Sequence, residues 1–154
     1  MAIEGLVIRA AREGDLHRVV ELIHLGAFSA SGENPGPPLP DGYRRAFAEI
    51  EADPNAMLMV AESAGEVVGT FSLAFIPNIS NGGGRVAQIE SVHVAEAWRG
   101  KGAGEAMLQW AIAESKARGC FRLQLTSNKG RKDAHRFYER LGFAKSHEGM
   151  KLKL

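Results

Sequence analysis

The segment that most constrains the fold of this chain is a glycine-rich loop, RGKGAG at positions 99–104. An apolar, partly alternating stretch, VAQIESVHV at 86–94, precedes the loop and predicts a strand. From Gly102 to Gly119, apolar side chains recur with the spacing of one helix face. A strand, a glycine loop and a helix in this order leave the N–H groups of the loop and of the first helical turn without partners. These groups form an anion-binding site.

The loop also narrows the kind of anion that it binds. Its glycines let the backbone come close to a pyrophosphate, and Arg99 and Lys101 add positive charge. A dinucleotide fingerprint does not fit, because Glu105 stands where that motif has its last glycine. A P-loop does not fit either, because Gly102 follows Lys101 where that motif has serine or threonine. The alternative is a glycine-rich turn that only opens a helix.

The rest of the chain predicts strands and helices that combine into one sheet with its covering layers. Strands are expected at 3–10, 57–62, 66–75, 86–94 and 120–126, with a terminal hairpin at 143–147 and 150–154. Helices are expected after Asp15, from Tyr43, from Gly102 and from Asp133, with Asp15 as a cap or in the first turn. The order βααβββαβαββ predicts an α/β fold, a central mixed sheet with helices on both faces.

The organisation along the chain predicts a single domain spanning residues 1–154. The longest predicted loop, SASGENPGPPLPDG at 29–42, is rich in proline and glycine and exceeds the length of a simple connection. Two interpretations remain open for this loop: a lid that faces the substrate, or a tolerated insertion.

Composition excludes several classes of function. The 154 residues are 45% hydrophobic and 24% charged, with a formal net charge of +1, so no strong field points to nucleic acid or to an anionic membrane. A single cysteine, Cys120, forms no intramolecular disulfide, which favours a cytoplasmic location. The sequence shows no apolar run long enough to span a membrane and no histidine spacing typical of a metal site, so neither membrane nor metal is expected.

Two separated motifs resemble the GNAT superfamily of N-acetyltransferases. Arg99, Gly102 and Gly104 match its signature Arg/Gln-x-x-Gly-x-Gly/Ala, and the segment AHRFYERLGF at 134–143 is similar to its second motif, a short helix ending in tyrosine and then Gly-Phe. The resemblance covers nearly the whole chain and is strongest from 86 to 143. It implies the acyl-CoA N-acyltransferase fold, in which strands 86–94 and 120–126 splay apart at one end.

The resemblance implies acetyl-CoA as cosubstrate. Its pantetheine arm is expected to pair with the backbone of the first splayed strand, as an added strand would. Its pyrophosphate is expected on the glycine loop. The residues expected to bind the cofactor are Val92, His93, Val94, Arg99, Gly100, Lys101, Gly102, Ala103, Gly104, Asn128 and His135. Arg131 stands where many relatives have an asparagine, so Asn128 is offset from the family pattern. Arg131 and Lys132 either contact coenzyme A phosphates or are solvated.

The reaction that the resemblance implies is direct attack of a neutral amine on a thioester through a tetrahedral intermediate. Tyr138 is the candidate acid that protonates the leaving thiolate, or else a core residue of its helix. Glu90 is the candidate base, directly or through water, or else a structural partner of an arginine. Some relatives carry a glutamate at the position of Gln88, which cannot act as a base. On a regular strand His93 faces away from Glu90, which favours packing over catalysis for His93.

The expected acceptor is the primary amine of a small molecule, because the C-terminal segment resembles the subgroup that contains aminoalkylphosphonate N-acetyltransferases. A protein or peptide N-acetyltransferase is one alternative. A non-catalytic domain that senses acetyl-CoA is another, and the presence of both Glu90 and Tyr138 argues against it. No nucleic-acid or membrane partner is expected, and a homodimer is the default assembly.

Overall fold

The computed structural model of the chain describes residues 3–154. Its strands are β1 (Leu6–Ala10), β2 (Ala56–Ser63), β3 (Glu66–Pro77), β4 (Arg85–Val94) and β5 (Cys120–Gln124). Its main helices are α1 (Leu16–Leu25), α2 (Asp41–Ala52), α4 (Ala103–Ala117) and α5 (Lys132–Arg140). Three short elements join them: η1 (Glu13–Asp15), α3 (Ser80–Gly83) and η2 (Glu96–Trp98).

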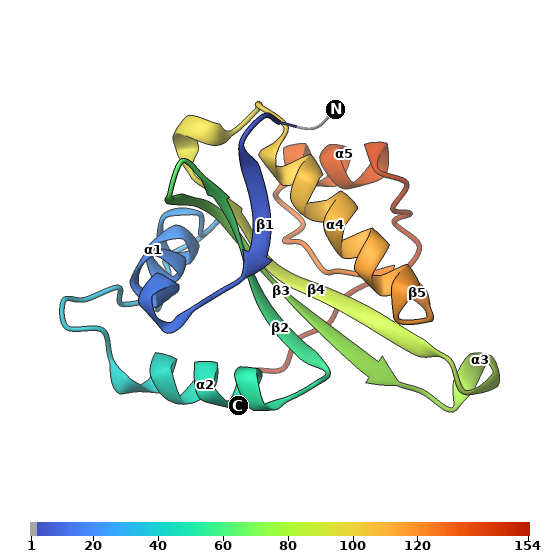
Figure 1. Ribbon diagram of the computed structural model, residues 1–154. Helices are drawn as coiled ribbons and strands as arrows, with labels where there is room; N and C mark the ends of the chain where they lie inside the picture. The colour runs from blue at the N-terminus through green and yellow to red at the C-terminus, as the bar shows by residue number, and fades with distance from the viewer. Residues whose placement is uncertain (1–2) are drawn as a thin grey trace.

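The strands form one five-stranded sheet in the order β1-β2-β3-β4-β5. The first four strands pair antiparallel with their neighbours, and β5 pairs parallel with β4. The parallel pair is possible because α4 carries the chain back across the sheet between β4 and β5 (Figure 1). The mixed sheet predicted from the sequence is therefore confirmed.

Helices cover both faces of the sheet, as predicted (Figure 1). On one face, Met107, Leu108 and Ala111 of α4 belong to a buried cluster with Phe71 and other side chains of the central strands. On the other face, α1 contributes to a second cluster with β2 and β3. The sheet thus has a buried layer on each side, and β4 lies between α4 and α1. Side chains at the end of β4 can therefore contact the layer on either face of the sheet.

The start of α1 is held by charge rather than by a helix cap. Asp15 makes no side-chain capping bond to α1. Its carboxylate accepts hydrogen bonds from the backbone N–H of Arg12, at 2.7 Å, and from the guanidinium of Arg9, at 2.7 Å. Arg9 also contacts Glu62 of β2 at 2.7 Å. The guanidinium of Arg9 is the main reason why the pKa of Asp15 is lowered.

The predicted terminal hairpin at 143–147 and 150–154 is wrong. The structure assigns no strand to residues 143–154. The apolar side chains of its second predicted strand, Met150, Leu152 and Leu154, are 85–111% exposed. An alternating pattern forms a strand only where a neighbouring strand satisfies its backbone, and an isolated two-stranded hairpin is marginal in water.

No helix within residues 3–154 has both the length and the apolar character required to cross a membrane.

Candidate active site

The strands β4 and β5 separate at one end, as the family resemblance implies. Their pairing ends at Gln88 and Gln124, whose side chains form a hydrogen bond of 2.8 Å from Gln124 Nε2 to Gln88 Oε1. Beyond this bond lies a cavity of about 70 Å³. It is lined by Ile89, Glu90, Ser91, Val92, His93, Leu125, Thr126, Ser127, Arg131 and Tyr138. The side chains of Gln88 and Gln124 therefore join the two strands at the last paired position, just before the strands diverge.

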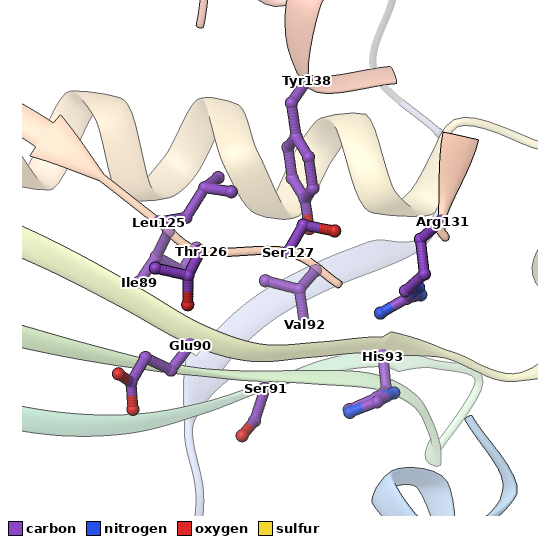
Figure 2. A pocket seen from close by; sticks show the side chains of 10 residues that line it. All are labelled: Ile89, Glu90, Ser91, Val92, His93, Leu125, Thr126, Ser127, Arg131 and Tyr138. Atoms are coloured by element: carbon purple, nitrogen blue, oxygen red, sulfur yellow. The ribbon is translucent and has the colours of Figure 1, made fainter. Parts of the chain in front are cut away.

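Tyr138 reaches this cavity from α5. Figure 2 shows its ring descending from the helix, with the hydroxyl directed toward the gap beside Val92 and Ser127. The ring packs on Phe137 and Phe143, with ring centroids 5.2 and 5.8 Å away. Burial raises the pKa of Tyr138, and the positive charge of Arg131 opposes that rise. The phenol is accordingly protonated at neutral pH and is held where it can donate a proton.

A bulge in β4 brings Glu90 and His93 to the same face of the strand. Thr70 pairs with His93 and Ser72 with Glu90, so one residue of β3 lies opposite two residues of β4. Ser91 adopts a φ of 52° within the bulge. Figure 2 shows the side chains of Glu90, Ser91 and His93 on one side of β4. The expectation that His93 faces away from Glu90 is wrong, because the extra residue shifts the alternation.

Glu90 and His93 differ in their surroundings. Glu90 is exposed, so the cost of burying a bare carboxylate, one argument for its role, does not arise. His93 is half-buried against the end of α1, where a Cβ built on Gly26 would lie 2.2 Å from Nδ1 of His93. Burial, together with the charges of Arg131 and Arg99, lowers the pKa of His93 to about 4. The imidazole is therefore neutral at physiological pH.

The glycine loop has the backbone geometry of an anion site. Gly100 and Gly102 have φ values of 70° and 89°, a region that favours glycine. Gly102 precedes α4, and no side chain caps the helix, so the N–H groups of its first turn remain available. Lys101 extends over the ring of Trp98, 5.9 Å from its centroid. The loop therefore presents a positive surface at the start of α4.

The part of β4 beyond Gln88 has an edge available on the side of β5. Pairing with β5 extends only from Arg85 to Gln88, whereas pairing with β3 continues to Val94. On that open edge, the carbonyl of Val94 accepts a hydrogen bond of 3.2 Å from Nε of Arg99. Backbone groups near Val92 and Val94 are therefore placed to pair with an extended ligand in the gap.

Comparison with known proteins identifies the family. The model of the acetyltransferase (GNAT) family matches residues 7–143. The chain belongs to the GNAT family. It is 35% identical over 105 residues to the aminoalkylphosphonate N-acetyltransferase of Salmonella typhimurium, covering 68% of each chain. It is 30% identical to the glucosamine 6-phosphate N-acetyltransferase of Trypanosoma brucei brucei, covering 99% of this chain and 98% of the relative.

The solved structures agree with this assignment. A protein from Bacillus halodurans C-125, described as a transcriptional regulator, superposes with a TM-score of 0.93 at 43% identity. The match covers 97% of this chain and 99% of that one. The GNAT fold is therefore shown, and membership of this family makes the protein an acetyl-CoA-dependent N-acetyltransferase.

The gap in this GNAT protein contains an unsatisfied polar atom that fits a cosubstrate. The hydroxyl of Ser127 is buried, lines the cavity and has no hydrogen-bond partner within residues 3–154. Buried hydroxyls are normally hydrogen-bonded, so this one is suited to a polar ligand group. Sequence reasoning missed Ser127, since nothing in TSN at 126–128 distinguishes a buried serine from an exposed one.

Among the residues expected to bind coenzyme A, Asn128 and His135 lie outside this cavity, at the turn before α5 and at the start of that helix. Asn128 is exposed, and its side chain accepts a hydrogen bond of 2.9 Å from the N–H of Gly130. The ring of His135 contacts the carbonyl of Asn128 through Nε2 at 2.9 Å. The two residues thus stabilise the turn that leads into α5. Their role in cofactor binding stays a prediction.

A second cavity of about 320 Å³ lies beside the same turn. It is lined by Phe28, Gly130, Arg131, Lys132, Asp133 and Ala134. Phe28 immediately precedes the loop predicted at 29–42. Residues of that loop line neither cavity, so the lid interpretation gains no support from this conformation. Arg131 lines both cavities.

The described part of the chain contains no cluster of three or more histidine, cysteine, aspartate or glutamate side chains that could hold a metal ion.

Proposed function

We propose that this N-acetyltransferase transfers acetyl from acetyl-CoA to the primary amine of a small molecule. The observation that carries the proposal is that Glu90 and Tyr138 line one cavity at the gap between β4 and β5. A proton acceptor and a proton donor are thus present at one site. Acyl transfer from a thioester to an amine needs both of them.

Each group has a distinct task in the proposed reaction. Glu90 removes a proton from the ammonium group, directly or through water, because a protonated amine has no lone pair for attack. The C–N bond then forms and the C–S bond breaks through a tetrahedral intermediate, while a backbone N–H near Val92 stabilises the oxyanion. Tyr138 gives its proton to the departing thiolate.

The residues that would hold acetyl-CoA fit its chemistry. The free N–H groups and glycines at 99–104 suit the pyrophosphate. The open edge of β4 at Val92 and Val94 suits the amides of the pantetheine arm, and the hydroxyl of Ser127 offers a further polar contact. When bound, acetyl-CoA supplies the activated acetyl group.

The acceptor class rests on the relatives. The two relatives named above act, by name, on an aminoalkylphosphonate and on glucosamine 6-phosphate, which are small amines. A homodimer remains the expected assembly.

The test is a steady-state assay of thiol release with acetyl-CoA and a panel of primary amines, comparing the parent protein with Tyr138→Phe and Glu90→Gln. Loss of a general acid or base lowers kcat by about 100-fold or more, so we expect losses of that size in both variants. Circular dichroism and thermal unfolding serve as controls for folding. Unchanged kcat in Tyr138→Phe would remove Tyr138 as the acid, and acetylation of peptides alone would overturn the small-molecule acceptor.

A further inference from the structure

The hydroxyl of Ser127 is a buried donor without an acceptor in the gap between β4 and β5. Its Oγ atom is buried and has no hydrogen-bond partner within residues 3–154. Such a hydroxyl destabilises the fold, because it has given up its hydrogen bonds to water and gained none in return. Ser127 is also one of the residues that line the cavity, which indicates that a ligand supplies the missing acceptor.

Ser127 lies near the hydroxyl of Tyr138. Figure 2 shows the side chain of Ser127 at the hydroxyl end of the Tyr138 ring, and both residues line the same cavity of about 70 Å³. The two hydroxyls are not bonded to each other, because Ser127 Oγ has no partner. They come from different elements, Ser127 from the segment after β5 and Tyr138 from α5. Two donors that share one small cavity without bonding to each other are placed to serve one atom of a ligand.

The base and the two hydroxyls lie on different sides of β4. Figure 2 shows Glu90 projecting from one side of the strand, whereas Ser127 and Tyr138 lie on the other. In the proposed reaction Glu90 acts on the attacking amine, so the two hydroxyls are left to act on the group that departs. That group is a thiolate, and an anion accepts stronger hydrogen bonds than a neutral group does.

The phenol of Tyr138 is a weak acid for this task when it acts alone. Burial raises its pKa, so the phenolate that would remain after proton transfer is disfavoured. A thiol has an ordinary pKa of about 8.5, below that of a phenol, so the thiolate does not readily take the proton. A second hydrogen-bond donor at the sulfur would stabilise the negative charge before the proton moves, because hydrogen bonds to the charged form favour that form.

We propose that Ser127 is a further catalytic residue, whose hydroxyl donates a hydrogen bond to the sulfur of the leaving thiolate. The inference rests on the proposed function, because it adds a residue to that reaction. No additional proton is transferred: as the C–S bond breaks, its electron pair goes to sulfur, Tyr138 supplies the proton, and Ser127 keeps its own. The competing role for Ser127 is a hydrogen bond to an amide of the pantetheine arm, which would contribute to binding and not to the departure of the thiolate.

The test compares the binding of CoA with that of desulfo-CoA, which lacks the sulfur atom and retains the amides of the pantetheine arm. Calorimetric titration gives both dissociation constants at pH 7 and at pH 9, below and above the ordinary thiol pKa of about 8.5. The variants are Ser127→Ala and the control Ser115→Ala. The control also removes a buried serine hydroxyl, but one outside the cavity that donates to the carbonyl of Ala111 at 2.7 Å.

We expect the parent protein to prefer CoA over desulfo-CoA more strongly at pH 9 than at pH 7, because the thiolate accepts stronger hydrogen bonds than the thiol. In Ser127→Ala the preference at pH 9 falls by about 10-fold, the effect of losing one hydrogen bond to a charged group. Ser115→Ala retains the parent preference. The inference is overturned if Ser127→Ala weakens both ligands equally, as a pantetheine contact would, or if the parent binds both equally at pH 9.

Two further readouts complete the test. Because the Ser127 hydroxyl has no partner to lose, Ser127→Ala without ligand should be at least as stable as the parent in urea unfolding, and a clear loss of stability would overturn the inference. With an amine that the parent acetylates, kcat of Ser127→Ala should fall by about 10-fold with KM for acetyl-CoA unchanged. If no amine is acetylated but the preference for CoA depends on Ser127, the proposed function fails and the thiolate contact stands. If amines are acetylated and that preference does not depend on Ser127, the inference fails and the proposed function stands.

Discussion

At the scale of single residues, the imidazole of His93 makes the stability of the fold depend on pH. Burial lowers its pKa to about 4, with further contributions from Arg131 and Arg99. The ordinary value is 6.5, so between pH 6.5 and pH 4 the unfolded chain binds a proton that the folded chain does not. Stability therefore falls as the pH is lowered through this range.

The prediction is that His93→Gln loses less stability than the parent between pH 7 and pH 5. Urea unfolding at the two pH values measures the difference. His147→Gln is the matched control, because His147 is exposed and lies outside the cavity. An NMR titration of the parent that gives His93 a pKa near 6.5 would contradict the burial argument.

The sequence locates some of the site residues and misses others for a physical reason. Glu90 and Tyr138 both lie at the cavity, as expected from the motifs, although their catalytic roles stay predictions. The side on which His93 lies depends on the bulge at Ser91, which arises from the register of β4 against β3. Serine has no preference for a positive φ, so the sequence carries no local signal of this bulge.

At the scale of secondary-structure elements, the junction of the glycine loop with α4 depends on Gly102. Its φ of 89° would strain any other residue by about 1–2 kcal/mol. We predict that Gly102→Ala lowers the free energy of unfolding by about this amount and also weakens acetyl-CoA binding. The second effect follows because the first-turn N–H groups of α4 would lose their alignment with the pyrophosphate.

Gly119→Ala is the control for this prediction. Gly119 follows α4 at its other end with a φ of 73°, and a Cβ there would meet nothing within 4 Å. Its substitution therefore introduces similar backbone strain far from the loop. Urea unfolding and calorimetric titration with acetyl-CoA compare the two variants. Equal loss of affinity in both would mean that strain alone, and not the loop geometry, reduces binding.

Elements with a strong local pattern were predictable, whereas the terminal hairpin, which has a weaker pattern, was not. The strand before the glycine loop and the helix after it appear as β4 and α4 within two residues of the predicted limits. The expected hairpin at 143–154 has the alternation of a strand without a neighbour to pair with. The periodicity of apolar residues in the sequence shows which face of an element is apolar. Whether a segment pairs as a strand depends on the neighbouring strands of the sheet.

At the scale of the whole molecule, the gap between β4 and β5 is a property of the sheet. The hydrogen bond between Gln88 and Gln124 lies at the last paired position of β4 and β5. Beyond it the two strands diverge and leave the cavity between them. α4 and α5 supply the glycine loop and Tyr138 from one layer, while α1 supports His93 from the other. A ligand in the gap would therefore contact elements from both faces of the sheet.

A ligand that joins these elements should stabilise the chain as a unit. At 100 times its dissociation constant, a ligand adds about 2.7 kcal/mol to the free energy of unfolding. For a chain of this size we predict that acetyl-CoA raises Tm by roughly 5–10 °C. Differential scanning fluorimetry with NAD and ATP as control ligands measures the shift. Because these controls also carry phosphates, an equal shift with all three would reflect a general anion effect, and no shift with saturating acetyl-CoA would contradict the assignment of the glycine loop.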